Sequence, residues 1–150
     1  MNNKELNRFR KEHISFIFQN YALMNFYTVY ENTEVPLIVR GIRKKERKSM
    51  VEKALTDVGI IDLAKKTPSE ISGGEKQRCA IARALVADND IILADEPTGS
   101  LDKTNGKNIM DIFDKLKEQH KTIILVTHDE FISGYADRIV RIEDGEITEK

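Results

Sequence analysis

The sequence SGGEKQRCAIARALVADNDIILADEPTGSLD, from Ser72 to Asp102, decides the fold of this chain. It opens with a serine, two glycines and a glutamate, and then runs through an alanine-rich segment. A polar triplet separates that segment from a short apolar run, which ends in the acidic pair Asp95-Glu96 and a glycine-containing turn. This order predicts a helix, a loop, a strand and then a turn that carries chemically useful side chains.

The first four residues of the stretch predict the start of a helix. Ser72, with Glu75 three positions later, fits a capping box, in which each side chain accepts a hydrogen bond from the backbone of the other residue. Gly73 and Gly74 let the backbone approach a bound group closely, and the first-turn amides together with the helix dipole favour an anion. An ordinary helix cap uses the same residue types, so both interpretations stay open on these four residues alone.

The apolar run Ile91-Ile92-Leu93-Ala94 is bounded by turn signals, which predicts a strand buried on both faces, as in a parallel sheet. Asp95 and Glu96 then lie at its carboxyl end, where open α/β sheets bind their ligands. Two adjacent acids there suit a hydrated Mg²⁺ and a water that must lose a proton. A solvated loop is the alternative, but the helix start before the strand, with Gly99 and Asp102 after it, disfavours that alternative.

Taken in order, these segments resemble one family, the nucleotide-binding subunits of ABC transporters. Five motifs carry the resemblance: Gln19 as the Q-loop glutamine, Ile71–Glu75 as the signature, Ile91–Glu96 as the Walker B strand with its catalytic glutamate, Ser100–Asp102 as the D-loop, and His128 as the switch histidine. The resemblance extends from about Leu6 to Gly145. Ile71 and Glu75 stand where leucine and glutamine are usual; Ile71 keeps the apolar contact, and Glu75 suits a helix N-terminus.

The phosphate-binding loop of this family, Walker A, is absent from the sequence. That loop requires glycine, four residues, and then Gly-Lys-Ser or Gly-Lys-Thr, so that backbone amides and the lysine hold the β and γ phosphates. The one Gly-Lys pair, Gly106-Lys107, has Leu101 five positions before the glycine and Asn108 after the lysine, and therefore fails twice. Because the family places Walker A before the Q-loop, the chain resembles the carboxyl-terminal portion of a nucleotide-binding domain.

The resemblance implies an α/β fold. It comprises a partial P-loop NTPase core, with a mostly parallel sheet and flanking helices, and a helical subdomain that carries the signature. Residues 21–86 correspond to the helical subdomain, and residues 6–20 with 87–150 correspond to the remaining core. The strand that bears Walker A is expected beside the Walker B strand, so leaving it out exposes an edge and apolar surface. We therefore expect the 150-residue polypeptide to be poorly stable or to associate.

Residue patterns outside the stretch predict further elements. They are a strand over residues 14–18, an amphipathic helix over 46–58 that ends at Gly59, a helix that ends near Gln119, a second buried strand over 122–126, and a closing hairpin over 138–148. His128 follows the second buried strand and lies at its carboxyl end. It is either a capped turn residue or, as the resemblance implies, the residue that touches the γ phosphate.

The resemblance also implies ATP and Mg²⁺ as cofactors and a second nucleotide-binding domain as a partner. Two domains pair head to tail, and each ATP site uses Walker A of one chain and the signature of the other. Ser72, Gly73 and Gly74 would therefore contact the γ phosphate held by the partner, and Glu75 belongs to the same nucleotide-binding signature. Asp102 would pass information between the two sites.

The remaining roles fall to residues at the ends of strands. By resemblance, Asp95 would hold Mg²⁺ through water, and Gln19 would contact the same ion. Glu96 would act as the general base for the attacking water. His128 and Gln19 would sense the γ phosphate.

Composition restricts the partners and the setting. A net charge of −1, with 33% charged residues, gives no basic field that would favour nucleic acid. The one cysteine, Cys79, fits a small core residue in a reduced, cytoplasmic setting. The sequence contains no run of about eighteen apolar residues, the length that a membrane-spanning helix requires. Its polar first residues do not resemble a signal peptide. The resemblance, rather than composition, implies a membrane permease subunit or domain as a partner, with this chain peripheral on the inner face of the cell membrane.

The residues also indicate a branch of this family, and two alternative roles stay open. Asn32 with Val35-Pro36-Leu37, and the residues around the D-loop, resemble the ATPases of lipoprotein-release, macrolide-export and antimicrobial-peptide-export systems. A non-transport ABC ATPase is one alternative, although only fifty-two residues separate Gln19 from Ser72, which disfavours the coiled-coil chromosome-maintenance kind. A non-catalytic partner that lends its signature helix to an intact subunit is the other.

Overall fold

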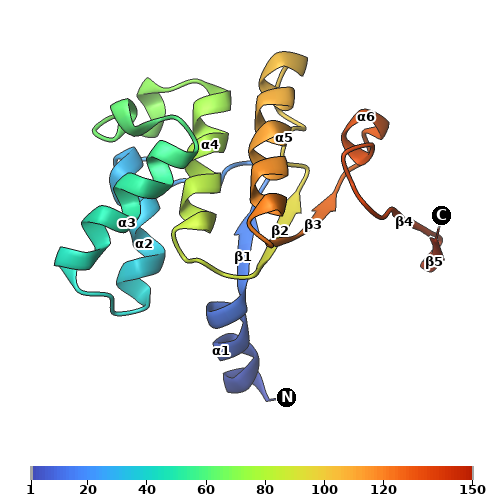
Figure 1. Cartoon of the computed structure of the whole chain (residues 1–150), viewed down its shortest axis with the longest axis horizontal. Coiled ribbons are helices and arrows are strands. Elements are labelled where there is room, and N and C mark those ends of the chain that lie inside the picture. The colour runs from blue at the N-terminus through green and yellow to red at the C-terminus, as the bar shows by residue number, and fades with distance from the viewer. Residues whose placement is uncertain (1, 150) are drawn as a thin grey trace.

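The computed structural model describes residues 2–149, which form two separate sheets (Figure 1). The larger sheet consists of β1 (Ile14–Ile17), β2 (Ile91–Asp95) and β3 (Thr122–Val126), which run parallel in that spatial order. The smaller sheet is the antiparallel hairpin of β4 (Val140–Glu143) and β5 (Glu146–Glu149). The parallel sheet and its helices confirm the predicted α/β class.

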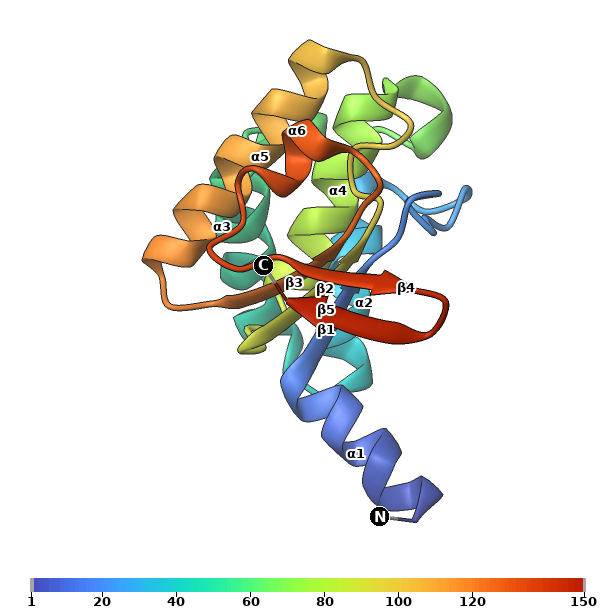
Figure 2. The same ribbon diagram turned by 90° about the vertical axis from the view of Figure 1, so that its right-hand side faces the viewer.

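The helices lie mostly to one side of the larger sheet (Figures 1 and 2). They are α1 (Asn3–His13), α2 (Val29–Val39), α3 (Lys44–Asp57), α4 (Gly73–Leu85), α5 (Lys103–Glu118) and the short α6 (Glu130–Ser133), with single 3-10 turns η1 (Ile61–Leu63) and η2 (Pro68–Glu70). The helices α2, α3 and α4 pack on one another. Against the sheet, α4 packs on β1 and α5 packs on β3.

The strand β2 occupies the centre of the sheet. Its Ile92 is in register with Ser15 of β1 on one side and with Ile123 of β3 on the other. Because a strand can pair with only two neighbours, both edges of the Walker B strand are already taken. The expectation that the Walker A strand lies beside it is therefore wrong, and any further strand has to join this sheet at β1 or β3.

Only one face of this sheet is covered within residues 2–149. The side chains that point toward α4 and α5 are buried: Ile17, Ile92 and Ala94. On the opposite face, Phe16 and Ile124 flank Leu93 in register and are 40% and 51% exposed. The prediction that residues 91–94 and 122–126 are strands buried on both faces is therefore wrong, because α4 and α5 cover the same face.

We expect the 150-residue polypeptide to associate through this open face. Phe16, Ile124 and Val126 present apolar side chains beside the edge of β3, and such surfaces favour self-association. Replacing Ile124 and Val126 together by threonine keeps β-branched residues in the strand and removes much of the apolar surface. The double variant should show a lower mass in light scattering than the unchanged polypeptide. A monomeric unchanged polypeptide with a sharp cooperative melt would contradict this expectation.

Local signals place the ends of the predicted elements well. The capping box before α4 is confirmed, since Glu75 N–H donates to Ser72 Oγ at 3.3 Å and Ser72 N–H donates to Glu75 Oε2 at 2.7 Å. The helix α3 ends just before Gly59, which has a φ of +71° that glycine adopts without strain. The predicted closing hairpin is also present as β4 and β5.

The core lies between the sheet and the helical layer. Its largest fully buried side chains include Phe113, Leu37, Leu55 and Ile81. Cys79 is also fully buried, and burial raises the pKa of its thiol to about 11, which confirms it as a small core residue. Among the described helices, none combines the length and the apolar character that crossing a bilayer requires.

Candidate functional site

The carboxyl edge of the parallel sheet gathers the predicted catalytic and metal-binding residues. Asp95 is the last residue of β2, and Glu96 follows it directly. Gln19 lies two residues beyond the end of β1, and His128 two residues beyond the end of β3. The N-termini of α4 and α5 point to the same edge (Figures 1 and 2). Two helix starts and three strand ends therefore surround one region.

Glu96 is held by the residues that follow β3. Its Oε1 accepts a hydrogen bond from the backbone N–H of His128 at 2.9 Å and lies 2.6 Å from Nδ1 of the His128 ring. The hydroxyl of Thr127 donates to Glu96 Oε2 at 3.1 Å. The Glu96 side chain is 16% exposed, whereas that of His128 is 86% exposed. The carboxylate of Glu96 is therefore fixed and mostly shielded from solvent, whereas the ring of His128 remains accessible to a ligand.

The backbone at Glu96 adopts a conformation that few residues accept. Its φ is +44°, in the left-handed region that disfavours side chains with a Cβ. Hydrogen bonds fix this turn on both sides, since Glu96 N–H donates to Val126 O at 2.9 Å and Gly99 N–H donates to Glu96 O at 3.0 Å. Unfavourable backbone conformations of this kind concentrate at functional sites. Here the turn directs the carboxylate toward the end of β3.

Gln19 approaches the same turn from β1. A Cβ added to Gly99 would lie 3.0 Å from Gln19 Nε2 and 3.4 Å from Glu96 Cβ. Glycine at position 99 therefore leaves room for the amide of Gln19 against the turn. Gln19 and Glu96, which lie far apart in the sequence, both adjoin Gly99.

The N-terminus of α4 has unused hydrogen-bond donors. The capping box uses the amides of Ser72 and Glu75, while those of Gly73 and Gly74 donate to no acceptor among the described residues. The Ser72 backbone N–H holds the pKa of the Glu75 carboxyl below its usual range, so the capping box persists at neutral pH. Two free amides at a helix N-terminus suit an anion.

Asp102 is linked to the signature through Asn105. The Asp102 side chain caps α5, where Oδ1 accepts the Asn105 backbone N–H at 3.0 Å and Oδ2 accepts Asn105 Nδ2 at 2.7 Å. These bonds from Asn105 hold the pKa of the Asp102 carboxyl below its usual range. A Cβ added to Gly74 would lie only 2.7 Å from Asn105 Oδ1. The start of α5 and the N-terminus of α4 are thus in close contact.

The side chains at this edge include some of the oxygen ligands that Mg²⁺ requires. Mg²⁺ in nucleotide sites takes one or two carboxylates, phosphate oxygens and water. Asp95 supplies an exposed carboxylate at the end of β2, and Gln19, whose amide nitrogen adjoins Gly99, also carries an amide oxygen. Within residues 2–149, no cluster of three or more His, Cys, Asp or Glu side chains forms a metal site of its own. Asp95 and Gln19 could therefore hold a Mg²⁺ ion only together with ligands from outside these two side chains.

Sequence patterns miss several residues that shape this site. Thr127 binds Glu96, and Asn105 joins Asp102 to Gly74. Asn105 stands three residues after the helix-capping Asp102, so capping rules could have indicated its contact. Thr127 carries no such signal, because its partner lies 31 positions away.

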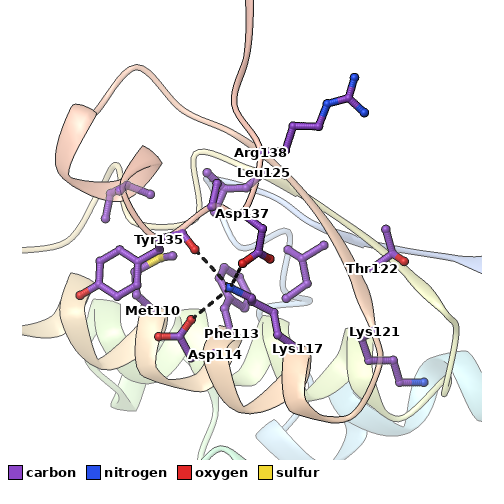
Figure 3. Close-up of a pocket in the computed structure, with 13 residues that line it drawn as sticks. Met110, Phe113, Asp114, Lys117, Lys121, Thr122, Leu125, Tyr135, Asp137 and Arg138 are labelled. Carbon is purple, nitrogen blue, oxygen red and sulfur yellow. Dashed lines mark hydrogen bonds and ion pairs between the residues drawn. The ribbon is translucent and has the colours of Figure 1, made fainter. Parts of the chain in front are cut away.

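A cavity in another part of the described chain does not contain these residues. It measures about 340 Å³ and lies between α5, β3 and the loop after α6 (Figure 3). Lys117 lies at its centre, where Nζ is 2.9 Å from Asp137 Oδ1, 3.9 Å from Asp114 Oδ1 and 3.4 Å from the carbonyl oxygen of Tyr135. The charge of Lys117 is therefore matched within the chain, and we assign the chemistry to the sheet edge instead.

Comparison with known proteins identifies the family. The family model described as ABC transporter matches residues 1–99. The chain belongs to the ABC transporter family. Among curated relatives of this ABC protein, the macrolide export ATP-binding/permease protein MacB of Neisseria meningitidis is 46% identical over 95% of this chain, and MacB of Salmonella typhimurium is 43% identical over the same share. The chain spans 22% of the length of each of these relatives.

Solved structures give the same result for this ABC chain. The dimeric structure of MJ0796, a bacterial ABC transporter cassette, has a TM-score of 0.86 and 36% identity, covering 99% of this chain and 68% of that chain. A second structure of MJ0796 is bound to ADP and Pi. CbiO1 from Clostridium perfringens has a TM-score of 0.89 and 29% identity, covering 98% of this chain and 59% of that chain. The resemblance and the fold class predicted from sequence are confirmed.

Proposed function

We propose that this chain is the carboxyl-terminal portion of a nucleotide-binding domain that couples ATP hydrolysis to transport through a membrane permease. One observation carries the proposal: the carboxylate of Glu96 is fixed by His128 and Thr127 beside Gln19 at the carboxyl edge of the sheet. This geometry suits a general base that is oriented by a histidine and a hydroxyl. The similarity to MacB supports the proposal that the chain belongs with the ATPases of lipoprotein-release, macrolide-export and peptide-export systems.

Each residue at the sheet edge has a distinct proposed role. ATP with Mg²⁺ supplies the phosphoryl group that is transferred to water. Glu96 accepts the proton of the attacking water, and its partial burial limits competition from bulk solvent. His128, with its exposed ring, reaches the γ phosphate. Asp95 holds Mg²⁺ through water, and Gln19 contacts the ion.

The signature helix acts in the second half of the site. The free amides of Gly73 and Gly74, with Ser72, bind the γ phosphate held by a partner domain, and Glu75 keeps the helix start in place. Asp102 communicates between the two sites of such a dimer. The MJ0796 cassette is described as dimeric, which supports pairing of this chain with a second nucleotide-binding domain.

The permease contact is proposed on the helical subdomain, residues 21–86. Phe26 is 97% exposed in the loop before α2, and Tyr27 beside it is 46% exposed. An exposed aromatic pair on an ordered loop suits a protein partner. The permease is either a separate subunit or a part of the same polypeptide, as the name ATP-binding/permease protein indicates for MacB. We place the chain at the inner face of the cell membrane.

A chimaeric cassette tests the proposed function. This chain is joined to a Walker A segment from an intact ABC cassette, and the product is named the completed cassette. We expect it to hydrolyse ATP in a Mg²⁺-dependent reaction, and to stimulate transport when its permease is present. A folded completed cassette that binds ATP but does not hydrolyse it would contradict the catalytic assignment.

The 150-residue polypeptide by itself should not bind ATP at micromolar concentration. The sequence contains no Walker A motif, so the lysine and the amides that hold the β and γ phosphates are missing from it. Titration calorimetry of the polypeptide with Mg-ATP should give no heat of binding, whereas the completed cassette should bind. Micromolar binding by the polypeptide alone would contradict this prediction.

A non-catalytic role is the second candidate. It is favoured by the N-terminus of α4, where the amides of Gly73 and Gly74 donate to no acceptor among the described residues. In this role the chain lends its signature to an intact subunit. Mixing the polypeptide with an intact homologous cassette should then change the ATPase rate of that cassette. No pull-down and no change in rate would exclude this role.

A further inference from the structure

We propose that Arg83 is a positioning residue that holds the Gln19 loop against the signature helix. Arg83 lies in the third turn of α4, and its guanidinium reaches two consecutive carbonyl groups after β1. Nη2 donates to Tyr21 O at 2.7 Å, and Nη1 donates to Ala22 O. A planar guanidinium can bind two neighbouring acceptors at once, which a lysine ammonium cannot do with the same geometry.

The two residues that Arg83 binds have an unfavourable backbone conformation. Tyr21 has a φ of +63° and Ala22 a φ of +48°, so two consecutive non-glycine residues lie in the left-handed region. L-residues rarely adopt this region, and surrounding contacts have to maintain it. Arg83 supplies such contacts, because its two hydrogen bonds require both carbonyl groups to face α4.

The loop is also held at the other end of the signature helix. A Cβ added to Gly73 would lie 3.2 Å from the hydroxyl oxygen of Tyr21. The Tyr21 side chain therefore lies against the first residue of α4, while its carbonyl binds Arg83 ten residues later in the same helix. The turn after Gln19 is thus attached to α4 at two places.

This attachment determines where Gln19 lies. Ile17 is fixed in β1 by its register with Ala94 of β2, and Tyr21 N–H donates to Phe18 O at 3.0 Å. Gln19 therefore stands between a sheet residue and a turn that Arg83 fixes. Its amide lies against Gly99, next to the general base proposed above. Releasing the turn from α4 should free Gln19 from this position.

Arg83 thus connects the signature helix with the Q-loop residue of the same chain. The metal contact of Gln19 rests on the proposed function, whereas its positioning by Arg83 does not. A test in the absence of nucleotide therefore separates the two. If Arg83 fixes the loop and the completed cassette fails to hydrolyse ATP, only the proposed function is lost.

Hydrogen exchange of the whole 150-residue chain tests the proposal. The variants are Arg83→Met, which removes the guanidinium, and Arg83→Lys, which keeps the charge. Arg78→Met is the matched control, because Arg78 is a half-buried arginine of α4 that lies near Gly59 instead. The reporters are the amides of Tyr21 and Ala22, compared with those of β2.

In Arg83→Met we expect exchange at Tyr21 and Ala22 to be at least about tenfold faster, with β2 unchanged. Arg83→Lys should show a smaller increase, and the Arg78→Met control none. The nuclear Overhauser contact between the Gln19 side-chain amide and Gly99 should be lost in Arg83→Met. Unchanged exchange, or an equal increase across the loop and β2, would overturn the proposal. If Arg83→Met does not fold, the exchange of Tyr21 and Ala22 relative to β2 in Arg83→Lys tests the proposal instead.

Discussion

Replacing Glu96 by glutamine should lower ATP hydrolysis by the completed cassette about a hundred- to ten-thousand-fold, the range expected for loss of a general base. Glutamine has nearly the same shape and can still accept the His128 backbone N–H that Glu96 accepts at 2.9 Å. It cannot accept a proton from the attacking water. ATP binding should therefore be retained while turnover is lost, and a steady-state phosphate-release assay measures this difference.

The matched control for this prediction is Glu118→Gln. Glu118 is an exposed glutamate at the end of α5, distant in the fold from the carboxyl edge of the sheet. The Glu118→Gln variant has the same change of charge as Glu96→Gln. Its rate of ATP hydrolysis should stay within about twofold of the unchanged cassette, as is usual for exposed surface sites. A folded Glu96→Gln variant that hydrolyses ATP at the rate of the control would rule out Glu96 as the base.

Replacing Asn32 by alanine should lower the free energy of unfolding by about 2–4 kcal/mol, because several partly buried backbone groups lose their partner at once. Asn32 is fully buried in α2. Its Oδ1 accepts Met24 N–H at 2.8 Å, and its Nδ2 lies 3.1 Å from Met24 O, 3.1 Å from Tyr27 O and 3.0 Å from Thr28 O. One side chain thus closes the loop that presents Phe26.

Urea unfolding, followed by circular dichroism, measures this loss. The control is Asn25→Ala, which removes an exposed asparagine from the same loop and should change stability by less than about 0.5 kcal/mol. The double variant of Ile124 and Val126 provides a background in which association does not obscure the transition. Equal stabilities of Asn32→Ala and Asn25→Ala would show that the four contacts of Asn32 do not hold the loop.

Local sequence signals predicted much of the secondary structure. Ser72 and Glu75 are three residues apart, so the hydrogen bonds that define their capping box form within one helical turn. The same rule applied to Asn2 and Glu5 would have predicted α1, which the hydrophobic pattern does not reveal because α1 buries none of its residues. Capping chemistry was therefore more informative for α1 than apolar periodicity.

The burial of the strands could not be predicted from the same signals. An apolar run such as residues 91–94 has the same composition whether one face or both faces are covered. The exposed positions of Phe16 and Ile124 depend on which helices contact the sheet. The neighbours of β2 likewise follow from chain topology, and so the predicted place of the Walker A strand was wrong.

The sequence by itself determined the family, the order of its motifs and the starts of helices such as α4, because these depend on neighbouring residues. Only the tertiary structure decided that Glu96 contacts His128 across 32 positions and that Arg83 binds Tyr21 across 62. Such contacts arise when strands and helices from distant parts of the chain pack together. Their distances follow from that packing, which no local pattern of residues encodes.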